Sequence, residues 1–191
     1  MKSKGIGSFI TSLLKGNITN NIPLANAILL CGISYLLGGT SSPQDNITEE
    51  LKKDTENKVF KNIRLLITKL GGLIRKCIDE EKPKEEKVLE DFRITSIDNY
   101  DFYDVKTKAM LRKNVSEPHY IDEVLYYREC IVTYRRAFKF LQLLCENNNI
   151  GNKNYIREQP GKSESINFIE IATKELRNIF LVLCSQIESI P

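Results

Sequence analysis

The chain has 191 residues, of which 41% are hydrophobic, enough for one substantial domain or two small ones with a buried core. Its 28 Lys and Arg and 25 Asp and Glu give a formal charge of +3. Because these charges are interspersed, no strong positive field exists to recruit nucleic acid or an anionic membrane, and we expect no nucleic-acid partner.

The reactive side chains do not indicate an enzyme. Five cysteines are present, an odd number with no CxxC pair, and four of them sit in apolar helical patterns. This pattern predicts reduced, buried thiols in a cytosolic setting. The single histidine, His119, excludes a histidine-based metal cluster. With no nucleophile–base pair and no phosphate-cradling glycine loop, we expect no catalytic activity.

The first three helices are predicted from apolar spacing and helix-end signals. Apolar residues at helical spacing predict an amphipathic helix over residues 5–14. Ile22 to Leu37 is more strongly apolar, but its apolar part is about 16 residues, short of the ~20 needed to cross a bilayer. We therefore interpret it as a buried core helix. A third helix should begin near Ser42, where a serine that can cap it precedes Pro43.

The clearest amphipathic pattern runs from Thr55 to Cys77, with apolar residues three and four apart almost throughout. Gly71 and Gly72 interrupt it. Each glycine costs about 1 kcal/mol relative to alanine in a helix, so a kink or break is expected there.

Residues 79–115 differ in composition, with a mixed-charge run followed by the aspartate- and tyrosine-rich stretch DNYDFYD at 98–104. Segments so charged and so poor in aliphatic residues bury too little to offset their ordering entropy, which predicts a partly disordered linker. The stretch at 98–104 lacks the central glycine and twelfth-position glutamate of an EF-hand, so a solvated acidic segment is the better interpretation.

Three further helical segments follow the linker. A long helix should start at 116–118 and run to Cys145. Asparagines then favour a turn, and a short helical piece around Tyr155 and Ile156 should end at Pro160 and Gly161. A last apolar pattern from Ile169 to Ile187 predicts a helix capped by Ser163 or Ser165.

No stretch alternates with period two, so the predicted fold is all-α. Helices with broad apolar faces joined by short turns are compatible with a closed bundle or with stacked helix pairs of the armadillo or HEAT kind. The sequence has no strict repeat that would decide between these two architectures.

Specific residue blocks resemble a known family. The block LQLLCENNN at 141–149, followed by NYIREQ at 154–159, resembles the RIH-associated domain of inositol trisphosphate receptors and ryanodine receptors. NAILLCGISYLLGGTSSPQ at 26–44 and VFKNIRLLITKL at 59–70 are similar to family segments in the same order. The likeness spans nearly the whole chain, although the linker matches only in position, and the C-terminal part is slightly closer to ryanodine receptors.

The resemblance implies an armadillo/HEAT-like solenoid segment of a large homotetrameric calcium-release channel. Its parts would be a helical solenoid segment over 1–78, a charged linker over 79–115 and an RIH-associated helical domain over 116–191. Such a segment would lie on the cytoplasmic face of the endoplasmic reticulum or another calcium-store membrane. It would meet the membrane only through the parent channel and would couple ligand and calcium sensing to the pore without a pore of its own.

One functional residue is implied by the resemblance. Glu146 matches the glutamate that supplies a carboxylate to the family's activating calcium site, to which a second glutamate further along the solenoid also contributes. Calcium takes 6 to 8 oxygen ligands and one carboxylate gives at most two, so Glu146 would be half of a calcium site. Without the family, it is a solvated carboxylate at a helix end.

Two interpretations remain open: a part of a calcium-release channel, and a stand-alone helical scaffold derived from one. Truncated solenoids expose an uncapped apolar end, because repeat arrays need polar capping repeats for solubility. As a channel segment, the isolated chain should therefore self-associate, which sedimentation velocity would detect. A monodisperse monomer with a cooperative thermal transition would instead favour the scaffold.

Overall fold

The computed structural model describes residues 4–37, 41–80, 118–146 and 149–188. All secondary structure in these ranges is helical, which confirms the predicted all-α class for them. The helices are α1 (Lys4–Leu14), the 3₁₀ helix η1 (Ile18–Asn20), α2 (Ile22–Leu36), α3 (Ser41–Lys53), α4 (Lys58–Glu80), α7 (Pro118–Cys145), α8 (Ile150–Glu158) and α9 (Phe168–Glu188). The predicted linker falls largely on residues outside these ranges.

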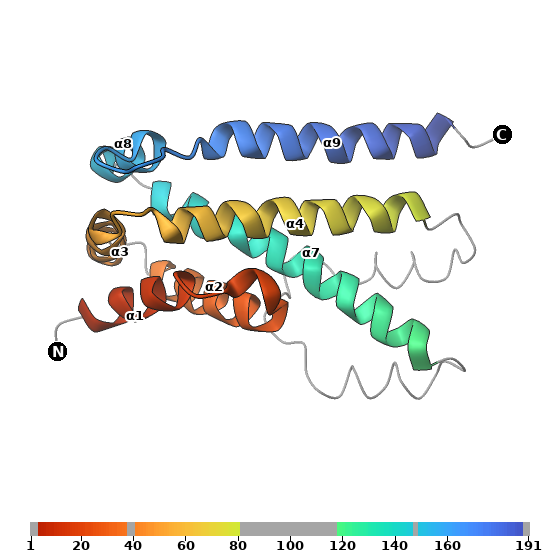
Figure 1. The fold of residues 1–191 in the computed structure, drawn as a ribbon, viewed down its shortest axis with the longest axis horizontal. Helices are drawn as coiled ribbons and strands as arrows, with labels where there is room; N and C mark the ends of the chain where they lie inside the picture. The colour runs from red at the N-terminus through yellow and green to blue at the C-terminus, as the bar shows by residue number, and fades with distance from the viewer. Residues whose placement is uncertain (1–3, 38–40, 81–117, 147–148, 189–191) are drawn as a thin grey trace.

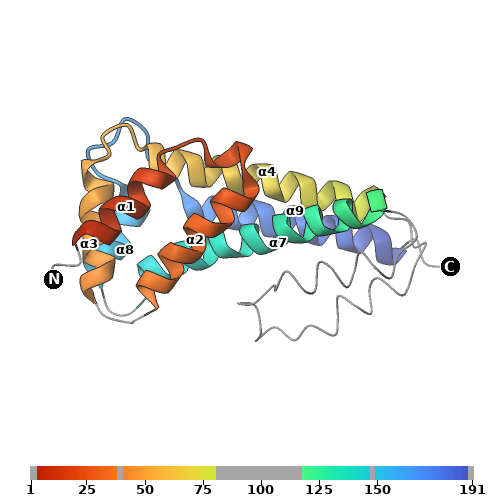
Figure 2. The same ribbon diagram turned by 90° about the horizontal axis from the view of Figure 1, so that it is seen from below.

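The helices lie in layers that α7 crosses. In Figure 1, α4 and α9 run side by side in the same direction, with α1 and α2 on the opposite side of α4. The short helices α3 and α8 lie together at the end of the molecule where α4 and α9 begin. Helix α7 packs obliquely on α2 and α4, as Figures 1 and 2 both show. Because α7 runs across these layers, the arrangement does not by itself show armadillo or HEAT repeats, and that architecture stays a prediction.

Helix α2 is buried along one face and exposed along the other, so the prediction of a buried core helix is correct only in part. Seven of its residues are buried: Ile22, Ala25, Ile28, Leu29, Gly32, Ile33 and Leu36. None of the helices in the described ranges is long and apolar enough to cross a membrane. The helix begins after Asn21, whose side chain accepts a hydrogen bond from the Leu24 amide at 3.0 Å.

Close packing joins α2 to α7 in the core. Phe140 of α7 is fully buried, and its ring lies so near the α2 backbone that a Cβ added at Gly32 would be 2.7 Å from the ring atom Cε2. No side chain larger than hydrogen fits there. One continuous hydrophobic cluster therefore contains residues from both sides of the predicted linker.

Helix α4 runs unbroken through Gly71 and Gly72, so the expected break is wrong. A Cβ at Gly71 would collide with the carboxylate of Glu175 on α9. That carboxylate accepts a hydrogen bond of 2.6 Å from Arg75. Gly71 therefore allows a buried acid from α9 to approach the α4 backbone.

Helix α4 also begins later than Thr55, the predicted start. The Asp54 side chain accepts a hydrogen bond from the Val59 amide at 2.8 Å, and Asn57 has a left-handed φ of 57°. A turn over 54–57 therefore precedes the first helical residue, Lys58.

The cap predicted for the last helix is wrong. Helix α9 begins at Phe168, and the Asn167 side chain accepts hydrogen bonds from the amides of Ile169 (3.1 Å) and Glu170 (3.2 Å). Ser163 and Ser165 are exposed residues in the preceding loop. Asparagine serves as well as serine at this position.

The prediction of buried thiols is correct only in part. Cys130 is buried and burial raises the pKa of its thiol to about 11. Cys145 is half-buried, whereas Cys31 is exposed, contrary to the prediction. Cys31 lies on the exposed face of α2, together with Leu24, Ala27 and Ser34.

We predict that Phe140→Ala lowers the free energy of unfolding by about 3–5 kcal/mol, because it empties the contact between α2 and α7. Phe9→Ala is the matched control, since Phe9 is 61% exposed, and should change stability by about 0.5 kcal/mol or less. Urea unfolding followed by circular dichroism would measure both variants. If both substitutions changed the free energy of unfolding equally, the packing of the helices before residue 81 on those after residue 117 would not depend on this contact.

Candidate functional site

Glu146 lies at the corner between α7 and α8. Helix α7 ends at Cys145, and α8 begins after Asn149, whose side chain accepts a hydrogen bond from the Asn152 amide at 3.1 Å. Asn149 therefore caps α8, as its side-chain chemistry predicts. The Asp45 carboxylate on α3 accepts hydrogen bonds from Asn149 (2.7 Å) and Asn152 (3.4 Å).

A buried glutamine holds the α7 side of this corner. The side-chain amide of Gln44 on α3 donates to the backbone oxygens of Leu143 (2.7 Å) and Glu146 (3.1 Å). Both carbonyls lie at the end of α7, where the last carbonyls have no donor four residues further along the helix. The Leu143 oxygen also accepts the Glu146 amide at 3.4 Å. Gln44 therefore fixes the backbone position of Glu146. Sequence reasoning missed this residue, although a glutamine on the same face as Ile47 and Leu51 was a possible signal.

The Glu146 carboxylate is half-exposed and already has two partners. Its Oε1 accepts a hydrogen bond from Gln142 at 2.9 Å and lies 3.5 Å from the Lys139 ammonium. No group of three His, Cys, Asp or Glu side chains that could hold a metal occurs in the described part of the chain. The residues described here therefore do not form a calcium site by themselves, and Lys139 would compete with a cation for this carboxylate.

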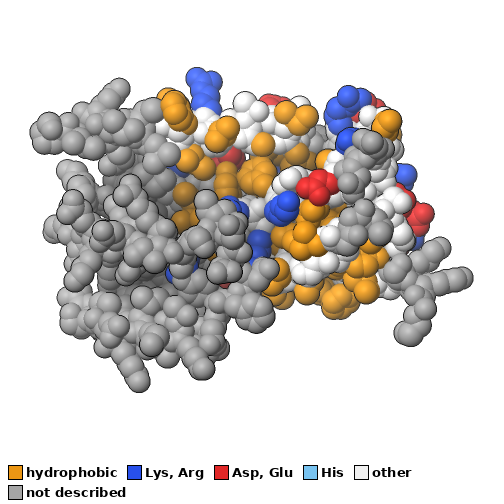
Figure 3. All heavy atoms as spheres, turned by 180° about the vertical axis from the view of Figure 1, so that it is seen from behind, with side chains coloured by type: hydrophobic (Ala, Val, Ile, Leu, Met, Phe, Trp, Pro, Cys, Tyr) orange, Lys and Arg blue, Asp and Glu red, His pale blue; other side chains and the backbone are white. Residues whose placement is uncertain are grey.

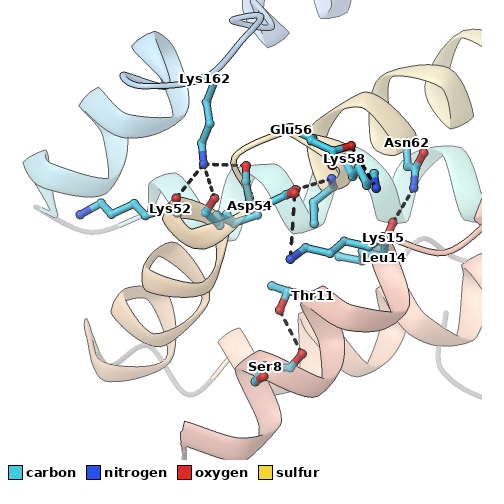
Figure 4. A network of polar contacts seen from close by, with 12 residues as sticks. Ser8, Thr11, Leu14, Lys15, Lys52, Asp54, Glu56, Lys58, Asn62 and Lys162 are labelled. Carbon is cyan, nitrogen blue, oxygen red and sulfur yellow. Dashed lines mark hydrogen bonds and ion pairs between the residues drawn. The ribbon is translucent and has the colours of Figure 1, made fainter.

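A second polar cluster joins the α3–α4 turn to the loop before α9. The Lys162 ammonium donates to the backbone oxygens of Leu51 (2.8 Å), Lys52 (2.8 Å) and Asp54 (2.7 Å), so it caps the end of α3 (Figure 4). Burial lowers the pKa of Lys162, with the Asp54 carboxylate opposing this effect. Asp54 also lies 4.0 Å from Lys15 of α1.

Side-chain amides continue this cluster into the C-terminal loop. Asn57 donates to Gln159 Oε1 at 2.7 Å and to the Glu164 backbone oxygen at 2.8 Å. Gln159, at the end of α8, has a left-handed φ of 44° and exchanges hydrogen bonds with the Ile166 backbone through its side chain. Because Asn57 and Gln159 are both buried, these bonds satisfy groups that water does not reach.

The sequence also pointed to His119 and to the acidic stretch at 98–104. His119 lies in the first turn of α7, and its side chain is outside the described set. The acidic stretch at 98–104 falls outside the described residues altogether. Arg136 donates to the Asn26 side chain of α2 at 2.6 Å, and Arg135 is exposed on α7.

The fold and this corner define an all-helical domain with an acidic residue at a helix–helix junction. Residues 128–190 match the family model described as RyR and IP3R Homology associated, a segment that contains Glu146, α8, α9 and most of α7. This match confirms the predicted resemblance over these residues, which are similar to that domain. No solved structure matches the chain.

We predict that Lys162→Met lowers the free energy of unfolding by about 1.5–3 kcal/mol, because the end of α3 loses a charged donor to three carbonyls. Lys174→Met, at an exposed position of α9, is the matched control and should be nearly neutral. Guanidinium unfolding would compare the two. If Lys162→Met left the free energy of unfolding unchanged, the Lys162 ammonium would not stabilise the packing of α3 against the loop before α9.

Proposed function

We propose that this chain is a cytosolic regulatory part of an intracellular ligand-gated calcium-release channel of the inositol trisphosphate or ryanodine receptor type. The observation that carries the proposal is the family match over residues 128–190, which places Glu146 within the matched domain. On this proposal the chain contributes no catalytic step and no pore. It works as one segment of a large tetrameric subunit at the cytoplasmic face of a calcium store.

The packing supports a coupling role. The core joins helices from both sides of the linker, and Gln44 ties α3 to the last turn of α7. A shift of α3 along its axis would therefore move the Glu146 backbone. Because close-packed interiors transmit displacement, a structural change in the N-terminal helices reaches this corner.

We further propose that Glu146 supplies one carboxylate to an activating calcium site whose other ligands lie outside this chain. The carboxylate is half-exposed at a helix corner, so a ligand from a neighbouring segment can reach it. Calcium must then displace the Lys139 ammonium from the vicinity of Glu146. Removing that ammonium should strengthen calcium binding, because a nearby positive charge disfavours a cation.

The test is calcium-activated release from store vesicles that contain the native full-length protein. We expect Glu146→Gln to shift activation to at least about tenfold higher calcium, since a neutral amide replaces a charged ligand. Lys139→Met should shift activation the other way, to lower calcium.

Glu158→Gln is the matched control, because Glu158 is an exposed carboxylate at the end of α8 paired with Arg157. It should leave the calcium dependence unchanged. Unchanged activation in Glu146→Gln would refute the calcium assignment, while a shift shared with Glu158→Gln would indicate a general charge effect.

A stand-alone helical scaffold is the second candidate. The observation that favours it is the large exposed apolar surface on α9, which includes Ile169, Leu176 and Phe180. Such surfaces mark protein-binding sites. In that case the chain would bind helical partners and would not affect calcium release.

A further inference from the structure

Helix α9 packs on α4 and leaves an apolar stripe exposed. Its buried side meets α4, where the Glu175 carboxylate accepts a hydrogen bond of 2.6 Å from Arg75. Away from this contact, Ile169, Leu176 and Phe180 are 69%, 71% and 62% exposed. Positions 169, 176 and 180 are 7 and 4 residues apart, so they form one stripe along the helix. An exposed apolar stripe of this kind marks a protein-binding surface.

An open groove of about 920 Å³ adjoins the start of this stripe. Ile169 belongs to both, and Ala172 and Thr173 also line the groove from α9. Phe138 of α7 and Ile156 of α8 contribute apolar side chains to the lining. Figure 3, which views the molecule from behind, shows hydrophobic side chains gathered on one part of the surface. The groove widens the apolar surface at the start of α9, so a partner that lies along the stripe gains further contacts there.

The charged residues beside the stripe form a pattern that is complementary to its own reverse. Glu170 and Arg177 are both exposed and seven residues apart, so they lie on the same flank of the stripe. Neither forms an ion pair with any residue that the structure describes. Reversing the helix about a point between residues 173 and 174 exchanges the acid for the base. Reversing it about the neighbouring point, between residues 172 and 173, exchanges Ile169 for Leu176.

We infer that α9 pairs in antiparallel orientation with α9 of a second copy of this chain, about a two-fold axis near residue 173. In such a pair each side chain faces the residue equally far beyond the axis, so Ile169 of one copy packs on Leu176 of the other. At a rise of 1.5 Å per residue, Glu170 lies within about 3 Å, measured along the helix, of Arg177 of the second copy. Lys174 of the second copy lies near the same carboxylate.

The residues at the two ends of the contact fit the same geometry. Ala172 and Thr173 lie at the axis, where their small side chains let the two helices approach closely. Phe180 is about 10 Å from the axis along the helix, which brings it to the start of the other copy's α9, where the groove opens. The two-fold symmetry forms every contact twice, so one patch of the chain supplies both sides of the interface.

The reversed charge pattern is what favours a second copy over an unrelated helix. A different partner could carry any sequence of charges and would place no requirement on the spacing of Glu170 and Arg177. Opposite charges across an interface fix its direction and register. A two-fold contact also closes on itself, so association stops at a dimer, whereas an uncapped solenoid end would stack into larger species.

Sedimentation equilibrium of the full chain measures the dimer dissociation constant. Glu170→Arg and Arg177→Glu each place like charges across the axis at both ends, so each should raise the dissociation constant at least about tenfold. An equal mixture of the two variants restores opposite charges at both ends, and it should dimerise at least about tenfold more tightly than either variant alone. A mixture no tighter than its components, or an unaltered chain that sediments as a monomer, would overturn the inference.

The apolar part of the contact has its own variant. Leu176→Gln should raise the dissociation constant at least about tenfold, because it removes the apolar contact with Ile169 of the second copy. Leu24→Gln is the matched control, since Leu24 is 46% exposed on α2, and it should dimerise as the unaltered chain does. A circular dichroism spectrum checks that each variant is folded. Equal weakening by both substitutions would contradict a contact through α9.

The size of the associated species separates this dimer from other modes of association. Species larger than a dimer that Leu176→Gln leaves unchanged would indicate stacking through another surface and would overturn the inference. The dimer does not rest on the calcium role of Glu146. Glu146→Gln should leave the dissociation constant unchanged, because Glu146 lies at the corner between α7 and α8 and outside the paired stripe.

Discussion

The contact between Phe140 and the α2 backbone at Gly32 is the constraint on which the rest of the structure depends. It brings α7, which follows residues 81–117, into the core built by the N-terminal helices. With α7 fixed, α4 has a further helix to pack on, and α9 packs on α4 as well. The matched domain is therefore packed on the N-terminal helices, and the position of its corner at Glu146 depends on where those helices lie.

Polar side chains also stabilise this packing, because they form hydrogen bonds with helix ends and a loop that are far away in the sequence. Gln44 bonds the end of α7, Lys162 bonds the end of α3, and Asn57 bonds the loop before α9. Each of these groups comes from the opposite side of the linker to its partner. Buried backbone groups without partners cost free energy, so these bonds favour one relative placement of the two halves.

The helices could be predicted from sequence because apolar spacing is a local signal, and the α1, α2, α3, α7 and α8 segments lie where the pattern indicated. Two failures depended on tertiary contacts, whereas the start of α4 and the cap of α9 are set by local side-chain bonds. Gly71 looked like a helix breaker, but it makes room for Glu175. The role of Gln44 could not be predicted, because its partners are about 100 residues away. Glu146 was found through its sequence block, and its neighbour Lys139 only through the structure.

The measurement that tests the channel assignment most directly is the size of the native protein that carries this segment. Full-length RNA sequencing, together with an immunoblot using an antibody to residues 128–190, would provide it. The account predicts a very large product that continues into pore-forming helices and sediments with calcium-store membranes. A soluble product close to 21.9 kDa would contradict it and would leave the chain as an independent helical scaffold.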